Sequence, residues 1–308
     1  MTGIFDIDHL MTWGLAALSF VLVLVLIPMA RRLAILCGLT DKPGGRKTHE
    51  DEVPLVGGLV IFPVFMVMGV VSGINLEAYW PLYVALTLLL ITGALDDRFH
   101  VGAWVRFAVQ ILAASIIVLF GDARLYHLGN LFGFGNLGLD FMSIPFSIVA
   151  VTLFVNAINL MDGLDGLAAG KSAVVLSLLM LACAIAGAWP PFFHMAILMA
   201  CILGFLFYNM RHPFRTKASI FLGDAGSLAL GLVLSWYCIG LAHEPDPVVV
   251  PITIAWIIAL PVIDACGQFY RRVREGRHPF DPDRGHFHHH FVHAGIPVGK
   301  STVIILTW

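Results

Sequence analysis

Charged residues are scarce in this chain of 308 residues, because Asp, Glu, Lys and Arg together make up only 12% of it. A soluble domain carries about 25%. A globule of this size must still cover its surface with polar groups, so the shortage excludes an ordinary soluble domain. Hydrophobic residues make up 59%, mean hydropathy is +0.88, and the apolar residues come in runs long enough to cross a bilayer. The composition therefore predicts a membrane protein.

The chain also lacks patterns typical of other classes. Its five cysteines show no CxxC or other metal-binding spacing, and most lie in apolar runs, where a thiol behaves as a small hydrophobe. The net charge is −2 and no basic tract is present, so we expect no nucleic-acid partner. We expect no cleavable signal, because the first apolar run, residues 13–30, is too long for one and is followed by Arg31 and Arg32.

The apolar runs predict an all-α polytopic membrane protein that forms a single domain, residues 1–308. About ten transmembrane helices are expected, near residues 11–30, 55–73, 79–95, 105–120, 143–160, 166–187, 191–210, 225–242, 248–269 and 300 onward. The last run stops at Trp308, too soon to cross. It is either a tenth helix that is cut short, which we favour, or not a span.

Orientation follows from the basic residues, because cytosolic loops keep most Lys and Arg. With the N-terminus outside, these ten runs place all of the 18 Lys and Arg residues except Arg124 at or near the inner face. The longest outer loop, residues 121–141, alternates apolar residues with Gly and Asn, which predicts a small periplasmic β-hairpin. The inner loops carry the polar clusters, so the active site is expected on the cytosolic face.

The first cluster is Asp96 and Asp97, at the inner end of the third run. Neighbouring residues on a helix point about 100° apart, so the two carboxylates cannot have the same role. Solvated acids at a helix end are an equally good interpretation of this pair alone.

The second cluster, NAINLMDGLDG, holds Asn156, Asn159, Asp162 and Asp165 at the inner end of the fifth run. Steps of three residues place them on nearly one face of an otherwise apolar helix. Polar groups at membrane depth are costly unless they bind something, which favours a functional role over a stripe that packs helices together.

The third cluster, FLGDAGS, leads into the eighth run and places Asp224 as an expected helix N-cap. A helix start suits phosphate and a carboxylate suits a cation, although the same motif would also serve as a plain cap.

The fourth cluster, DPDRGHFHHHFVHAG, carries Arg284, His286, His288, His289, His290 and His293. So many imidazoles could bind a transition metal, or could donate to phosphates and a sugar. A solvated loop is the remaining interpretation.

Together the clusters collect Asp96, Asp97, Asp162, Asp165 and Asp224 on one inner surface. Such acids repel one another unless some are protonated or a cation lies among them. Oxygen ligands point to Mg²⁺ or Mn²⁺, held by one or two protein groups and substrate phosphates. With helix-start amides and His or Arg donors, this set favours phosphoryl transfer.

The motifs DDRFHVG, NAINLMDGLDGL, IFLGDAGS and DRGHFHHH, in this order, resemble those of the polyprenyl-phosphate N-acetylhexosamine-1-phosphate transferase family, which includes the phospho-MurNAc-pentapeptide translocase. RKTHEDEVPLVGG extends the resemblance, which covers essentially the whole chain. The chain looks most like the bacterial undecaprenyl-phosphate GlcNAc-1-phosphate transferases. The resemblance implies transfer of GlcNAc-1-phosphate from UDP-GlcNAc to undecaprenyl phosphate, releasing UMP, with Mg²⁺ or Mn²⁺ as cofactor. It also implies a place in the bacterial inner membrane, at the first step of a lipid-linked cell-surface polysaccharide pathway, such as O-antigen or cell-wall synthesis.

Site roles come from the same resemblance. Asp224 looks like the main metal ligand with Asn159 as its companion, and Asp96 looks like the base on the lipid phosphate. The full set is catalytic Asp96, Asp97 and Asp162; substrate-binding Asn156, Asp165, Arg284, His286, His288, His289, Asp264 and Lys47; and metal-binding Asp224 and Asn159. His290 falls outside the family pattern. We favour direct attack by the lipid phosphate over a phosphorylated aspartate, because that phosphate is already an ionised nucleophile.

Several alternatives stay open. Another N-acetylhexosamine is an alternative for the sugar, and a homodimer is an alternative for the assembly. Asp264 lies within the membrane near its inner edge, either as a functional acid or paired with Arg271 or Arg272. A secondary transporter would place its acids near the midplane, whereas in this chain only Asp264 is embedded and the other acids lie at the inner rim. A membrane metallohydrolase would need a helical metal-binding spacing with a Glu, which HFHHH lacks.

Overall fold

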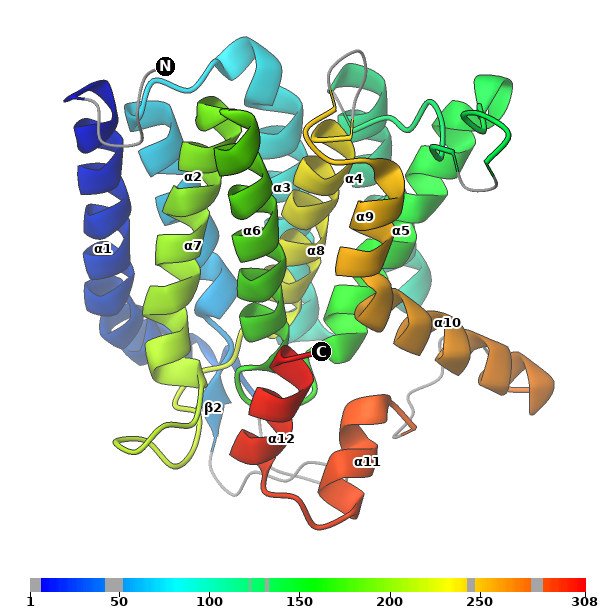
Figure 1. The fold of residues 1–308 in the computed structure, drawn as a ribbon. Coiled ribbons are helices and arrows are strands. Elements are labelled where there is room, and N and C mark those ends of the chain that lie inside the picture. Colours follow the sequence, from blue (N-terminus) through cyan, green and yellow to red (C-terminus); the bar gives the residue numbers. More distant parts are fainter. Residues whose placement is uncertain (1–6, 42–51, 122, 131–132, 243–246, 278–284) are drawn as a thin grey trace.

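The computed structural model describes residues 7–41, 52–121, 123–130, 133–242, 247–277 and 285–308, and the described part is mostly helical (Figure 1). Its longer helices are α1 (Ile7–Cys37), α2 (Gly57–Val71), α3 (Leu76–Phe99), α4 (Ala103–Phe120), α5 (Ser143–Met161), α6 (Leu167–Ala186), α7 (Trp189–Asn209) and α8 (Gly223–Gly240). They are followed by α9 (Pro251–Ile257), α10 (Ala259–Arg274), α11 (Phe287–His293) and α12 (Val298–Leu306). Strands β1 (Thr40–Asp41) and β2 (Val53–Pro54) and the 3-10 helix η1 (Asp140–Met142) complete the elements.

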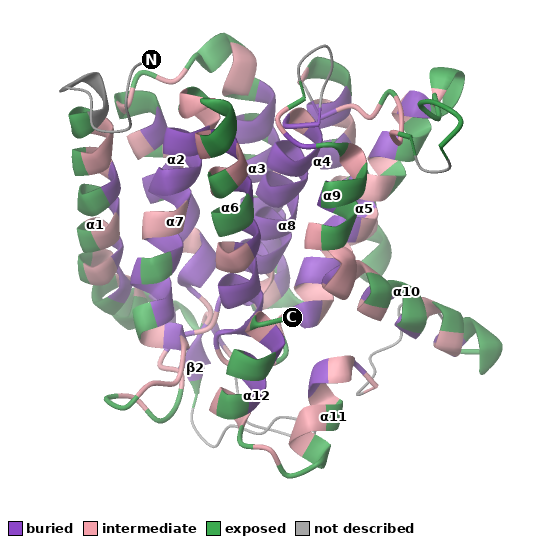
Figure 2. Ribbon diagram, viewed as in Figure 1, coloured by how far each residue is buried: buried purple, intermediate pink, exposed green. Residues whose placement is uncertain are grey.

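Successive helices run in opposite directions, so α3 and α5 end where α4, α6 and α8 begin (Figure 1). We call this the site end of the bundle; β2, α11 and α12 lie there too. Helix α8 is central, and nearly all of its residues are buried among α2, α3, α5 and α6 (Figure 2). The bundle thus brings three of the predicted polar clusters to one end, as expected from the alternation of the runs. Which side of the membrane this end faces stays a prediction.

Six helices among the described residues are long and apolar enough to cross a membrane, or up to seven if the bent pair α9 and α10 counts as one span. The prediction of about ten spans is therefore not confirmed, although a helix lies at each predicted run. Helix α2 has only 15 residues, and α12 has 9. Helix α8 carries Gly, Ser and Asp residues in its first turns and is covered by protein rather than exposed to lipid.

The predicted ninth span is broken at Ile258, where α9 and α10 meet at an angle of 71°. Pro261 has no N–H to donate to the Ile257 carbonyl, and its ring crowds that carbonyl. The apolar run at residues 248–269 predicted a span here but gave no sign of the bend. As a result α10 projects sideways from the site end of the bundle (Figure 1).

The loop between α4 and α5, which the sequence analysis placed outside, contains an antiparallel bridge between His127 and Gly138. The Leu128 N–H donates to the Leu137 carbonyl at 2.9 Å, and the Leu137 N–H donates to the Gly129 carbonyl at 3.0 Å. The expected hairpin is thus present as a bridge rather than as a regular pair of strands.

A small sheet at the site end was not predicted. In it β1 pairs antiparallel with β2, and Thr40 lies opposite Pro54. The Phe221 N–H donates to the Pro54 carbonyl at 2.8 Å, and the Gly57 N–H donates to the Phe221 carbonyl at 3.0 Å. The segment that precedes α8 is therefore held against the start of α2.

Candidate active site

The start of α8 is capped by a residue from another helix. Gly223 begins the helix with a φ of +76°, a conformation that glycine adopts without strain. Near the end of α3, Asp97 accepts the Asp224 N–H at 2.9 Å with Oδ1 and the Ala225 N–H at 3.4 Å with Oδ2. The prediction that Asp224 is the N-cap was wrong. Asp97 satisfies the free N–H groups of α8, and this leaves the Asp224 side chain available for other contacts.

Two glycines let neighbouring helices approach this start closely. A Cβ on Gly58 of α2 would overlap the backbone of Gly226, and one on Gly93 of α3 would overlap the backbone of Ala225. Both positions therefore require glycine for the observed packing. Close packing from both sides fixes where the Asp224 carboxylate lies.

The Asp224 carboxylate is held between two donors. Its Oδ1 accepts from Asn159 Nδ2 at 2.8 Å, and its Oδ2 accepts from Arg106 Nη1 at 3.2 Å. The same Arg106 nitrogen forms an ion pair with Asp96, which is only 7% exposed. Asn159 Nδ2 also donates to Ser227 Oγ at 2.9 Å. The carbonyl oxygen of Asn159 has no partner in the described part of the chain, so it is available as an acceptor or metal ligand.

The turn after α5 carries the other two predicted acids. Helix α5 ends at Met161, so Asp162 and Asp165 lie beyond the helical stripe that the sequence analysis extended through them. Asp165 Oδ2 accepts from Arg211 Nε at 2.7 Å and from the Ala218 N–H at 3.4 Å. Its contacts therefore tie the turn to the segment between α7 and α8.

A cavity of about 980 Å³ opens between these elements. Its lining includes all five predicted aspartates, together with Asn159 and, from β1, Asp41. Burial, together with the nearby charges of Asp97 and Asp165, raises the pKa of Asp162 to about 7. Asp162 therefore exchanges a proton near neutral pH. Gathered acids of this kind are favourable only when a proton or a cation compensates their charge.

The donor set suits a hard divalent cation. Among the described residues no three His, Cys, Asp or Glu side chains form a ready metal-binding group. Mg²⁺ is usually held by one or two carboxylates, waters and substrate phosphates, so a closed protein cage is not required. Asp224 and the free carbonyl oxygen of Asn159 are oxygen donors of the right kind. We therefore find that the residues present fit the implied Mg²⁺ or Mn²⁺.

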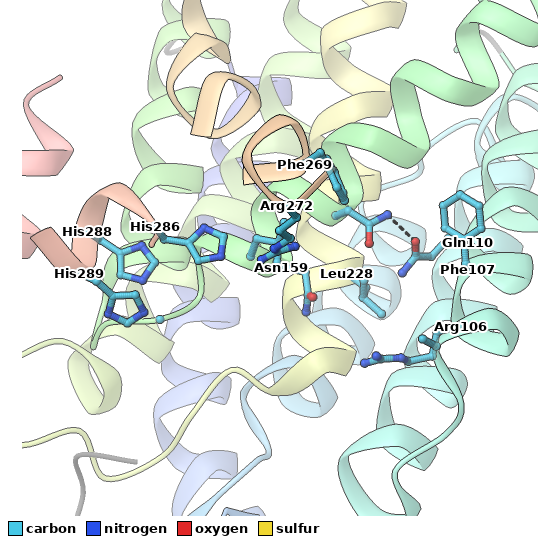
Figure 3. A pocket seen from close by; sticks show the side chains of 14 residues that line it. Arg106, Phe107, Gln110, Asn159, Leu228, Phe269, Arg272, His286, His288 and His289 are labelled. Carbon is cyan, nitrogen blue, oxygen red and sulfur yellow. Dashed lines mark hydrogen bonds between the residues drawn. The ribbon is translucent and has the colours of Figure 1, made fainter. Parts of the chain in front are cut away.

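A second cavity, of about 290 Å³, adjoins the first and contains cationic and imidazole groups (Figure 3). Arg106, Asn159, Gly163 and His289 line both cavities. Asn156 lies only in the second cavity, where its Nδ2 donates to Gln110 Oε1 at 2.6 Å. The two Asn residues thus differ in position: Asn159 lines both cavities, whereas Asn156 lines only the second.

The His segment lies against the turn after α5. His288 is completely buried, and neither ring nitrogen has a hydrogen-bond partner among the described residues. Burial, together with the neighbouring His289 and His286, lowers its pKa to about 3, so the ring is neutral. A Cβ on Gly163 would overlap the His288 ring. A buried polar group without a partner is unusual in a native protein and here faces a cavity that a ligand could fill.

Within the described part of the chain, Asp264 forms no hydrogen bond or ion pair with Arg271 or Arg272. Its Oδ2 lies 2.8 Å from His286 Nδ1, and its Oδ1 accepts the Phe287 N–H at 3.0 Å. Of the two alternatives left open for Asp264, pairing with Arg271 or Arg272 is therefore not the one observed. It binds the start of α11 instead. Two other predicted substrate-binding residues, Lys47 and Arg284, lie outside the described residues.

From the sequence, Arg106 and Arg211 were expected only as inner-face charges, and Gln110 was not singled out. Arg106 and Gln110 are four residues apart in an otherwise apolar run, so they share one face of α4. That spacing was a usable signal. Arg211 gave none, because its role depends on the turn against which it packs.

Comparison with known proteins gives a consistent result. Residues 79–242 match the model of a family described as glycosyl transferase family 4. The chain is 33% identical over 281 residues to an undecaprenyl-phosphate alpha-N-acetylglucosaminyl 1-phosphate transferase of Escherichia coli O157:H7, an alignment that covers 90% of this chain and 75% of the relative. It is 34% identical over 292 residues to a probable undecaprenyl-phosphate N-acetylglucosaminyl 1-phosphate transferase of Bacillus subtilis (strain 168), covering 93% and 79%. With its apolar helices and these matches, the chain is a multi-pass membrane transferase that belongs to glycosyl transferase family 4.

Proposed function

We propose that the protein transfers GlcNAc-1-phosphate from UDP-GlcNAc to undecaprenyl phosphate. An oxygen of the lipid phosphate attacks the β-phosphorus of UDP-GlcNAc, and the bond from that phosphorus to the bridging oxygen breaks. UMP leaves with the bridging oxygen. The products are undecaprenyl-diphosphate-GlcNAc and UMP. The names of the relatives from Escherichia coli and Bacillus subtilis support both the lipid acceptor and the transferred group.

We call the larger cavity, with the five predicted aspartates, the acidic cavity, and the smaller one, with its arginines and histidines, the basic cavity. The observation that carries the proposal is that these two cavities meet beside the start of α8. Carboxylates bind a diphosphate through a cation, whereas Arg and His donate directly to phosphate oxygens. Arg106 lies on the boundary between the two cavities. A substrate diphosphate placed across this boundary would have both kinds of group within reach.

Asp224 and Asn159 would hold the Mg²⁺ or Mn²⁺. When bound, the cation would neutralise charge on the diphosphate and on the departing UMP. Asp97 contributes by holding the Asp224 backbone through its contacts with the start of α8. Arg106, now shared between Asp96 and Asp224, would turn toward a phosphate oxygen once a cation takes its place on Asp224.

Direct attack by the lipid phosphate is the mechanism that we favour. A phosphorylated intermediate would need an aspartate oxygen that is free to attack. Both oxygens of Asp97 accept N–H groups of α8, and both oxygens of Asp224 accept side-chain donors. Asp96 remains the proposed base for a lipid phosphate that still carries its last proton, which such phosphates lose near pH 6.

The reaction has to occur at a membrane boundary, because its two substrates are a lipid phosphate and a water-soluble nucleotide sugar. We place the site at the cytosolic face of the bacterial inner membrane, following the distribution of Lys and Arg. Its product would be the first lipid-linked intermediate of a cell-surface polysaccharide pathway.

Purified protein in detergent, given undecaprenyl phosphate, Mg²⁺ and UDP-GlcNAc labelled in the sugar, should produce a labelled lipid and release UMP. Release of UDP would instead mean transfer of the sugar alone and would contradict the proposal. UDP-GalNAc in a parallel reaction tests whether another N-acetylhexosamine is the preferred donor. Asp224→Asn should abolish Mg²⁺-dependent turnover, while Asp140→Asn, an exposed control in the outer loop region, should not.

A further inference from the structure

Helix α10 holds the start of the His segment through one face. Asp264, Gln268 and Arg271 follow one another at intervals of four and three residues, which places them on the same side of the helix. Gln268 Nε2 donates to the Gly285 carbonyl, and Arg271 Nη2 donates to Gln268 Oε1 at 2.6 Å. The bend at Ile258 is what brings this face of α10 against the segment that begins α11.

Asp264 makes the contact that reaches a cavity-lining side chain. Its two oxygens accept from His286 Nδ1 at 2.8 Å and from the Phe287 N–H at 3.0 Å. The side chains of His286 and Asp264 are 5% and 8% exposed. A buried carboxylate has to be compensated by partners, and these two donors compensate this one.

The carboxylate sets which ring nitrogen of His286 carries the proton. A carboxylate only accepts hydrogen bonds, so Nδ1 of His286 has to be protonated to face it. The remaining nitrogen, Nε2, is directed away from α10. The His286 ring lies parallel to the His288 ring, with centroids 5.6 Å apart, in the basic cavity (Figure 3). Arg106, Arg272 and His289 line the same cavity, so the ring faces a space suited to an anion.

We propose that Asp264 is a positioning residue for the reaction: it fixes the orientation and tautomer of His286, so that His286 presents Nε2 to the phosphoryl groups of the bound substrate. This inference rests on the proposed function, because it assigns the anion in the basic cavity to the substrate.

Asp264→Asn is the informative substitution. The Asn oxygen can accept only one of the two facing donors. The backbone N–H of Phe287 cannot change its role, so the Asn oxygen has to remain there and the Asn NH₂ has to face His286. Nδ1 of His286 then becomes the acceptor and its proton moves to Nε2. Asp264→Asn should therefore reverse the tautomer without removing any volume.

The first measurement is NMR of protein labelled with ¹⁵N-histidine in detergent, with the His286 signals assigned by their loss in His286→Gln. Wild type should have the proton on Nδ1, and Asp264→Asn should have it on Nε2. Glu275→Gln is the control, because it removes an exposed carboxylate just after the same helix and should leave the His286 signals unchanged. An unchanged tautomer in Asp264→Asn would overturn the inference. This result does not depend on whether the protein transfers GlcNAc-1-phosphate.

The second measurement is a double-mutant cycle on kcat/KM for UMP release. Loss of a partner that orients a functional ligand typically costs about 10- to 100-fold. We expect a loss of that size in Asp264→Asn, and little further loss when it is combined with His286→Gln. Asp264→Glu should recover part of the activity, because it restores the charge. Fully multiplicative losses would show that Asp264 acts independently of His286 and would overturn the proposal. Absence of UMP from wild type would instead contradict the proposed function.

Discussion

Substitution of Asp97 tests whether this residue positions α8 or takes part in the reaction. The resemblance to the family assigns it a place beside the base, whereas the geometry makes it the cap of α8. Asn is in general as good a helix cap as Asp, and its one oxygen can keep the 2.9 Å contact with the Asp224 N–H while the longer contact with the Ala225 N–H is lost. Replacement of a capping Asn or Asp by Ala costs about 1 kcal/mol. One kcal/mol corresponds to about a fivefold change in an equilibrium. If capping is the main role, Asp97→Asn should keep most of the activity and Asp97→Ala should lose about fivefold or more.

The assay is UMP release below saturation, with thermal unfolding of each variant in the same detergent. Asn75→Ala is the matched control. Asn75 caps α3 at the opposite end of the bundle by accepting the Glu77 N–H at 3.1 Å. Its loss should lower stability by a similar amount and leave turnover near that of wild type. If Asp97→Asn is folded but as inactive as Asp97→Ala, the charge of Asp97 acts on the reaction and the capping explanation fails.

Three further predictions concern residues around the same site. The pKa of Asp162 is raised to about 7, so its carboxyl is protonated below that pH. The Mg²⁺ concentration for half-maximal turnover should therefore rise as pH falls from 8 to 6, by up to about tenfold per pH unit. A Mg²⁺ requirement that does not depend on pH would contradict this. Gly93→Ala should destabilise the protein by about 1–3 kcal/mol in thermal unfolding, because the new Cβ would overlap the α8 backbone. Gly14→Ala in α1 is the control, since no atom lies near that position, and it should not destabilise the protein. Equal stability of the two variants would refute the packing argument. Arg106→Gln should lower the free energy of unfolding by about 1–3 kcal/mol, because it leaves the buried Asp96 carboxylate without its ion pair. An unchanged unfolding temperature would show that this ion pair contributes little.

Much of the fold could be predicted from hydrophobic runs, because a membrane helix is specified by its length and composition. The number of helices that cross the membrane could not be predicted in this way. The run at residues 225–242 predicted a span, yet α8 is not among the helices long and apolar enough to cross, and only the packing of its neighbours reveals that it is buried in protein. The break at Ile258 was also hidden. Pro28, Pro63 and Pro81 lie inside continuous helices, so a proline alone did not mark the bend before Pro261.

At the site, motif order correctly indicated which acids would gather, since all five predicted aspartates line one cavity. The sequence could not give the partners that distinguish them. Asp97 caps α8 from a position 127 residues earlier in the chain, and Asp264 reaches His286 across 22 residues. Such contacts depend on tertiary packing rather than on local spacing. The same limit explains why Arg106 was counted only as an inner-face charge, although it joins Asp96 to Asp224.

The position of the transferred phosphate tests the central claim most directly. UDP-GlcNAc carrying ³²P at the β-phosphate should be incubated with the purified protein, undecaprenyl phosphate and Mg²⁺, and the lipid and nucleotide fractions should then be separated. We expect the label in the lipid, with unlabelled UMP formed in equal amount. Label that remains in the nucleotide as UDP, while GlcNAc appears on the lipid, would contradict transfer of a sugar phosphate at this site.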